Sequence, residues 1–139
     1  MAVTSLSPDY SPSEDESFMN DIMREYFRQK LLTWKEDLLQ ESNETLENLQ
    51  DGGITEPDIA DRATMETDRS LELRTRDRER KLIAKIDAAL ERIEDGSYGY
   101  CEETGEPISI GRLEARPIAT LSIEAQERHE RLERTQRDD

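Results

Sequence analysis

Two long stretches of the chain carry apolar residues at helical spacing and contain neither glycine nor proline. In residues 17–50, the apolar positions recur in steps of mostly three and four, at Ile22, Tyr26, Phe27, Leu31, Trp34, Leu38, Leu46 and Leu49. In residues 58–95 the stripe is Ala60, Ala63, Thr67, Leu71, Leu82, Ile86, Ala89, Leu90 and Ile93, interrupted by Arg74 and Arg78. These steps place most of the side chains on one face, so each stretch is predicted to be a long amphipathic helix.

The run D-G-G-I-T-E-P-D at 51–58 breaks the pattern and predicts a turn between the helices. Because each helix must bury its stripe on the other, the two should pair as an antiparallel coiled-coil hairpin. The predicted fold is therefore mainly α. It comprises an N-terminal segment at 1–20 packing on the head, a coiled-coil arm at 21–96 with its tip near 51–63, and a small globular head at 97–139.

The predicted head opens with the turn-rich run G-S-Y-G-Y-C and ends in a charged C-terminal helix. Ser122 is a plausible N-cap of that helix, with Ala125 at its third position. Apolar residues gather in this segment and are expected to form a small core: Tyr98, Tyr100, Pro107, Ile108, Ile110, Leu113, Pro117, Ile118, Leu121 and Ile123.

The head segment also keeps the spacing of a four-cysteine zinc ribbon without its ligands. Two residues separate the first and second positions and the third and fourth positions, and 17 residues lie between the pairs. The four positions hold Cys101, Thr104, Ser122 and Ala125. A single thiolate does not make a tight zinc site, so the ribbon is degenerate and zinc is not expected. We expect Cys101 to be a half-buried remnant without a lowered thiol pKa, because Glu102 and Glu103 oppose a thiolate.

Charge bounds the class of partner. The 139 residues include 34 acidic and 19 basic residues, a net charge of −15, which disfavours direct binding to nucleic acid. The charge favours a basic protein partner, although many cytosolic bacterial proteins are simply acidic. The run R-T-R-D-R-E-R-K at 74–81 alternates in sign and fits a salt-bridged helix better than an RNA-binding surface. One cysteine excludes an intramolecular disulfide, and no apolar run is long enough to span a membrane. With no signal-peptide pattern at the N-terminus, the expected location is the cytoplasm.

Two carboxylates stand beside the predicted turn. Asp58 and Asp61 are three residues apart at a helix start, so they lie on the same side. One reading is helix capping, with Asp58 as the N-cap and Asp61 at the positive helix end. The other is an exposed pair at the tip of the arm, directed at a partner's catalytic centre or its bound metal. Both readings stay open. The chain lacks a catalytic triad, a phosphate loop and an H-E-x-x-H motif, so it is not predicted to be an enzyme.

Several motifs together resemble the DksA/TraR family of bacterial RNA-polymerase regulators. They are the tip P-D-I-A-D-R-A-T, the run L-E-L-R-T-R-D-R-E-R-K-L-I-A-K-I, and the segments Y-G-Y-C and R-L-E-A-R-P. The resemblance as a whole covers about residues 19–130. The resemblance implies a monomer whose arm enters the secondary channel of RNA polymerase. There, together with ppGpp, the family modulates promoter open complexes, inhibiting ribosomal RNA promoters and favouring others. The missing ligands resemble the cysteine-poor branch, which acts without zinc.

The resemblance also implies site residues. The D-x-x-D-x-A tip becomes Asp58, Asp61 and Ala63. The positions that help to form a ppGpp site at the polymerase interface become Leu82, Lys85, Arg116 and Gln126. Gln126 stands where the family usually has lysine, which puts the strength of the ppGpp response in doubt.

Three alternatives remain at this point. A Gre-like transcript-cleavage factor also inserts an acidic-tipped hairpin into the channel, although Ala63 and R-L-E-A-R-P favour DksA. A non-enzymatic coiled-coil scaffold or dimer, and a metal-binding or redox-switch protein, are the other two.

Overall fold

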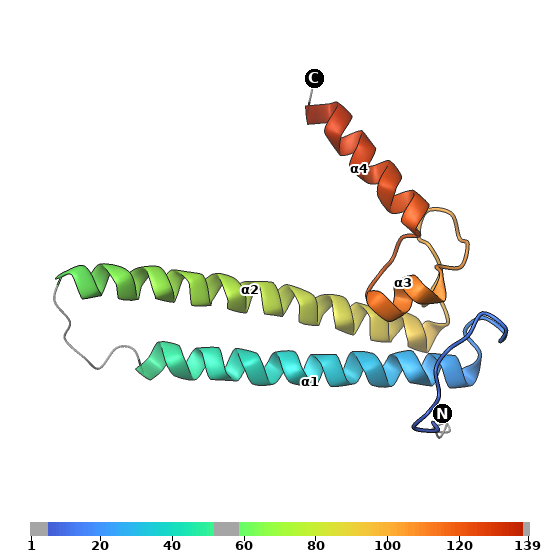
Figure 1. Cartoon of the computed structure of the whole chain (residues 1–139), viewed down its shortest axis with the longest axis horizontal. Helices are drawn as coiled ribbons and strands as arrows, with labels where there is room; N and C mark the ends of the chain where they lie inside the picture. Colours follow the sequence, from blue (N-terminus) through green and yellow to red (C-terminus); the bar gives the residue numbers. More distant parts are fainter. Residues whose placement is uncertain (1–5, 52–58, 138–139) are drawn as a thin grey trace. The chain divides into compact units, whose positions relative to one another are not determined.

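The chain folds into four helices in the part that the computed structural model describes, which is the backbone of residues 6–51 and 59–137 (Figure 1). They are α1 (Asp21–Asp51), α2 (Ile59–Asp95), α3 (Ile110–Ala115) and α4 (Ile123–Arg137). Among these residues, extended pairing is limited to one antiparallel bridge between Tyr100 and Pro107. The prediction of a mainly α fold with a long helical hairpin is confirmed.

The chain divides into two compact units. The head unit combines Met1–Leu31 with Ala88–Asp139, and the arm unit is the continuous stretch Leu32–Asp87. Each of the two long helices therefore contributes to both units.

In the arm unit, α1 and α2 run antiparallel and lie side by side (Figure 1). Lys35 Nζ on α1 lies 2.7 Å from Asp87 Oδ1 on α2, and this pair fixes the register of the two helices. Leu38 and Ile86 are buried within the same unit. The apolar stripes of the two helices therefore pack against each other around Leu38 and Ile86, as the sequence predicted.

The buried positions of α2 recur with a heptad spacing and do not coincide with its apolar residues. Between residues 70 and 81, all side chains are exposed except those of Glu72, Arg76 and Glu79. The same face continues in steps of four and three to Ile83 and Ile86, the 3.5-residue repeat of a coiled coil. Leu71 is 53% exposed, so the predicted stripe is wrong at that position. The repeat of the pairing, not the polarity of each residue, decides which side chains face α1.

The head unit has a core built from the start of α1, the end of α2 and the segment that follows. Its buried apolar members are Met23, Phe27, Leu31, Ala89, Ile93, Tyr98, Cys101, Ile108, Ile110, Leu113, Ile118, Ala119 and Ala125. At its centre, the Tyr98 ring lies 5.6 Å from the Phe27 ring, centroid to centroid. The Tyr98 hydroxyl donates a 2.7 Å hydrogen bond to the carbonyl oxygen of Pro117.

The predicted apolar cluster of the head is buried in most of its members, but not in all. Tyr100, Pro107 and Ile123 are exposed, contrary to the expectation. Neighbouring residues of an extended backbone point to opposite sides, and Cys101 takes the inward position next to Tyr100.

The N-terminal segment contacts the head through an aromatic pair and a close approach. The Phe18 ring packs edge-on against the Tyr100 ring at 5.3 Å. A Cβ at Gly99 would lie 3.0 Å from Met19 Cε and 3.1 Å from Phe18 Cζ, and the φ of Gly99 is +91°. Glycine is therefore the residue that both the backbone and the space require there.

Candidate functional site

The predicted tip lies mostly outside the described residues. Asp58 is not described, and α2 begins directly after it at Ile59. Asp61 lies in the first turn of α2, and its side chain is outside the described set. Ala63 is exposed on the next turn. The roles assigned to these three residues stay predictions.

The four residues predicted at a ppGpp site are divided between the two units. In the arm unit, Leu82 is half-buried and Lys85 is exposed. In the head unit, Arg116 is the exposed C-cap of α3, and half-buried Gln126 donates from Nε2 to Glu130 Oε1 at 3.4 Å. The structure describes each pair within its own unit, and their joint role stays a prediction.

The ribbon positions do come together in the head, but as a hydrogen-bonded turn rather than as a ligand set. Cys101 is 2% exposed. The Thr104 hydroxyl accepts from the backbone N–H of Glu106 at 3.2 Å, and the Ser122 hydroxyl accepts from the N–H of Ala125 at 3.2 Å. Ser122 thus caps α4, as predicted, because the N–H groups of the first helical turn lack partners within the helix.

These positions do not fit a zinc ion. Ala125 has no ligand atom, both hydroxyls already accept from backbone donors, and Cys101 supplies the one thiol. Among the described residues, no group of three or more His, Cys, Asp or Glu side chains is arranged to hold a metal.

The thiol environment corrects one expectation. Burial raises the pKa of Cys101, but hydrogen bonds from the backbone of Ser122, from the hydroxyl and backbone of Thr104 and from the backbone of Glu103 outweigh burial and lower that pKa to about 6. The sequence argument counted the acidic side chain of Glu103, whereas in the structure the backbone of that residue acts on the sulfur. The carboxylate of Glu103 instead contacts Nε2 of His129.

Backbone hydrogen bonds close the loop that carries these positions. The N–H of Cys101 donates to the carbonyl of Glu106 at 2.8 Å, and the N–H of Gly105 donates to the carbonyl of Cys101 at 2.9 Å. The N–H of Glu102 donates to Thr120 across the loop at 2.9 Å. Together with the Tyr98 hydroxyl bond, these contacts give the head a source of order that does not involve a metal.

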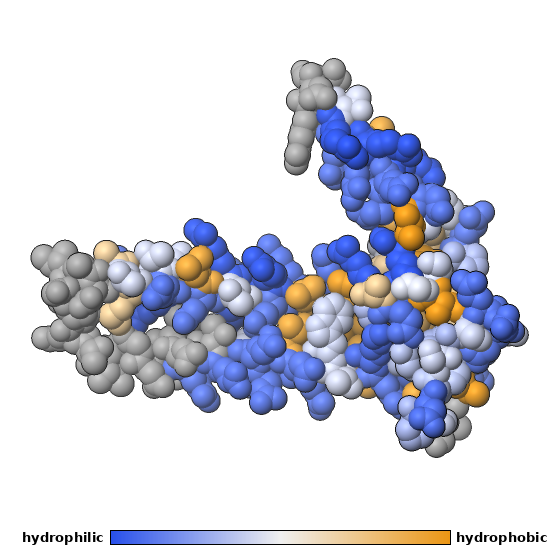
Figure 2. Space-filling view, in the orientation of Figure 1, coloured by the Kyte–Doolittle hydropathy of each residue, from blue (hydrophilic) through white to orange (hydrophobic). Residues whose placement is uncertain are grey.

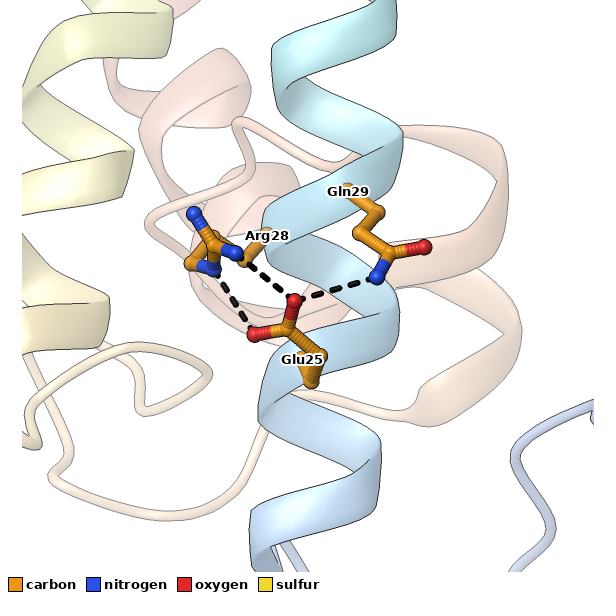
Figure 3. A network of polar contacts seen from close by, with 3 residues as sticks. All are labelled: Glu25, Arg28 and Gln29. Carbon is orange, nitrogen blue, oxygen red and sulfur yellow. Dashed lines mark hydrogen bonds and ion pairs between the residues drawn. The ribbon is translucent and has the colours of Figure 1, made fainter. Parts of the chain in front are cut away.

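Two carboxylates are buried among the described residues, and their surroundings differ. Glu25 on α1 accepts from Arg28 Nε and Nη2, both at 2.7 Å, and from Gln29 Nε2 at 3.0 Å (Figure 3). These bonds to Arg28 outweigh burial and lower the pKa of Glu25. Glu79 on α2 leaves Oε2 without a hydrogen-bond partner. Sequence reasoning missed both residues. The heptad spacing from Ile93 back to Glu72 is the signal that would have found Glu79.

The described surface is largely hydrophilic on the face shown in Figure 2, in keeping with the net charge of −15. The exposed large apolar side chains among the described residues include Leu39, Leu71 and Leu73. None of the helices that the structure describes combines the length and hydropathy needed to cross a bilayer.

Two family models match most of the chain. The model for the N-terminal domain of the DnaK suppressor protein DksA matches residues 23–93, and the model for the prokaryotic dksA/traR C4-type zinc finger matches residues 96–131. The second match covers the loop in which three of the four ligand positions are not cysteine.

Relatives and a solved structure agree with these matches. The RNA polymerase-binding transcription factor DksA of Caulobacter vibrioides is 70% identical over 131 residues, which cover 94% of this chain and 92% of that protein. The protein of the same name from Escherichia coli K12 is 44% identical over 124 residues, covering 89% and 82%. The structure of transcription factor DksA2 from Pseudomonas aeruginosa superposes with a TM-score of 0.79 at 43% identity, covering 84% of this chain and 90% of the other.

Proposed function

This chain belongs to the DksA family, and from that premise we propose that it is a transcription regulator that binds bacterial RNA polymerase. The observation that carries the proposal is the 70% identity, over 94% of the chain, to a protein named as an RNA polymerase-binding transcription factor. The site of action is then the bacterial cytoplasm, where transcription takes place, and the action is regulatory rather than enzymatic.

The arm is the part of the chain proposed to enter the secondary channel of the polymerase. Two features of the arm unit support this role. Its helices are held in register by the Lys35–Asp87 pair, and its outer surface is charged and exposed. A thin paired helix needs no further core, so it can extend into a narrow channel as a monomer. Asp58, Asp61 and Ala63 are proposed to act at its tip.

The head is proposed to work without zinc. The poor fit of Cys101, Thr104, Ser122 and Ala125 to a metal supports this, as does the hydrogen bonding that occupies Thr104 and Ser122. The co-regulator ppGpp is proposed to act at the polymerase interface through Leu82, Lys85, Arg116 and Gln126. Guanidinium and ammonium groups suit phosphate oxygens, and Lys85 and Arg116 are exposed.

In vitro transcription from a ribosomal RNA promoter, with purified polymerase and with or without ppGpp, tests the function. Wild-type protein is expected to reduce the promoter signal, and Asp61→Asn to abolish that reduction while the protein still binds polymerase. Asp68→Asn is the matched control, because it removes an exposed carboxylate from the same helix of the same unit. Equal inhibition by the wild type and by Asp61→Asn, at equal polymerase occupancy, rules out the tip assignment.

The same reaction, together with one on a stalled and backtracked transcription complex, separates two of the alternatives. A Gre-like factor shortens the transcript in a backtracked complex, whereas a DksA-type regulator leaves its length unchanged. A coiled-coil scaffold leaves promoter activity unaltered at every concentration. If the folded wild-type protein changes no promoter signal at any concentration, the proposed function is contradicted.

A further inference from the structure

Glu79 is a buried carboxylate that the arm leaves partly unsatisfied. The residue is 7% exposed, and its Oε2 has no hydrogen-bond partner. One turn earlier on the same face, Arg76 Nε is also buried without a partner. Arg76 and Glu79 form no ion pair in the described part of the chain. An unpaired buried carboxylate lowers the stability of the packing around it.

The register of the arm shows what faces Glu79. From the Lys35–Asp87 pair, Glu79 lies about 12 Å back along α2, and the position the same distance forward along α1 is Asn43. The half-buried Ser42 lies beside that position, and the exposed Glu41 is near enough for its charge to act on Glu79. The next carboxylate along α1, Glu44, is exposed.

The facing part of α1 offers Glu79 no cation. Residues 36–51 of α1 contain six acidic residues and neither lysine nor arginine, while Lys35 already pairs with Asp87. The nearest positive charge on the inward face of α2 is Arg76. Burial and the charge of Glu41 both raise the pKa of Glu79.

The position of Glu79 divides the interface between α1 and α2 in the arm unit into two kinds of packing. On one side lie apolar layers that contain Leu38, Ile83 and Ile86. On the other side the inward positions of α2 are Arg76 and Glu72. Glu79 sits at the boundary, so its charge state decides whether the apolar packing meets a neutral or an ionised layer.

We propose that Glu79 makes the packing of α1 against α2 in the arm unit respond to pH, so that the protonated carboxyl tightens this layer and the ionised carboxylate loosens it. The inference does not depend on polymerase binding.

The sign follows from linkage. For an acid with a raised pKa in the paired state, the paired state binds the proton more tightly than the open state does. Lowering the pH through the range between the pKa values of the two states therefore stabilises the pairing of α1 with α2. This stabilisation is lost as the pH rises through the pKa of the paired state. Glu25 in the head unit has a lowered pKa, so acidification acts on the head in the opposite sense.

Amide hydrogen exchange on the full chain between pH 5 and pH 8, corrected for intrinsic rates, tests the proposal unit by unit. The probes are the backbone amides of residues 38–46 and 72–83. In the wild type, their protection should rise severalfold as the pH falls, and each pKa unit between the paired and open states corresponds to a tenfold change. In Glu79→Gln, the same amides should be highly protected from exchange at pH 8, and their protection should lose most of its pH dependence.

The matched control is Glu66→Gln, which removes an exposed carboxylate from the same helix and unit and so changes the net charge equally. It should keep the wild-type profile. The proposal is overturned if Glu79→Gln and the wild type share one profile, or if Glu66→Gln shifts the profile as much as Glu79→Gln does.

A direct titration gives an independent reading. The carboxyl carbon of Glu79, assigned by NMR from its loss in Glu79→Gln, should titrate above the usual glutamate range. Glu41→Gln should move that midpoint down, because it removes the facing charge. A Glu79 midpoint at or below the ordinary glutamate value refutes the mechanism.

Discussion

Replacing Tyr98 by phenylalanine removes one oxygen atom from the centre of the head and leaves its ring in place. The lost bond is the 2.7 Å hydrogen bond to the Pro117 carbonyl, formed by a side chain that is 2% exposed. A net hydrogen bond contributes about 0.5–1.5 kcal/mol, and a buried carbonyl left without a donor costs about 1–3 kcal/mol. We expect Tyr98→Phe to lower the free energy of unfolding by about 1–3 kcal/mol. Burial raises the pKa of Tyr98, so its hydroxyl remains a donor throughout the neutral range.

Urea unfolding at pH 7 in the presence of EDTA, followed by near-ultraviolet circular dichroism, measures this loss. The midpoint should fall while the slope stays unchanged, because the exposed area on unfolding is the same. Tyr100→Phe is the control: Tyr100 is 37% exposed, and its hydroxyl makes no hydrogen bond within the described residues. A Tyr98→Phe midpoint equal to that of the wild type, or an equal loss in Tyr100→Phe, refutes the view that buried organic contacts order the head.

Three further predictions concern metal, pH and ppGpp. Elemental analysis of the purified protein should find less than stoichiometric zinc, and EDTA should leave its melting temperature unchanged; a one-to-one zinc content contradicts this. Because the pKa of Cys101 is lowered from 9.0 to about 6, the thiolate stabilises the head above pH 9, and this contribution declines as the pH falls to 6. The stability difference between the wild type and Cys101→Ser should follow that curve, with the thiolate absorbance at 240 nm titrating near pH 6; a flat difference rejects it. Alanine at both Lys85 and Arg116 should blunt the ppGpp effect on transcription and retain part of the basal activity, whereas alanine at the exposed Lys81 and Arg128 should not; an unaltered ppGpp response in the first pair counts against the site.

The helical hairpin was predictable because apolar spacing and the break at 51–58 act over tens of residues. The cap at Ser122 was predictable too, since it depends on neighbours three residues away. The inward position of Glu79 was missed because the stripe was traced through apolar residues such as Leu71, whereas coiled-coil geometry counts positions irrespective of polarity. A strict heptad count would have found it.

The thiol environment of Cys101 was beyond the sequence for a different reason. Its partners are mainly backbone groups, and one of them, at Ser122, is 21 positions away along the chain. The closed loop, and not the residue type, sets which way the backbone N–H groups point. An argument from side chains alone therefore had Glu103 raise the pKa of Cys101, whereas its backbone lowers it. The tip and the proposed ppGpp residues remain predictions for transcription assays.

The head unit is discontinuous in sequence, whereas the arm unit is one stretch, and this imposes an order on synthesis. The arm is complete once Asp87 has left the ribosome. Phe27 is synthesised well before Tyr98, and Phe18 well before Tyr100, so these two ring contacts form only after the second segment of the head has been made. Contacts so distant in sequence form slowly unless the intervening chain is already closed. In the folded protein, the pairing of α1 with α2 holds Lys35 beside Asp87 and so shortens the loop between the two segments that build the head. Pairing of the arm therefore reduces the entropy cost of bringing these segments together.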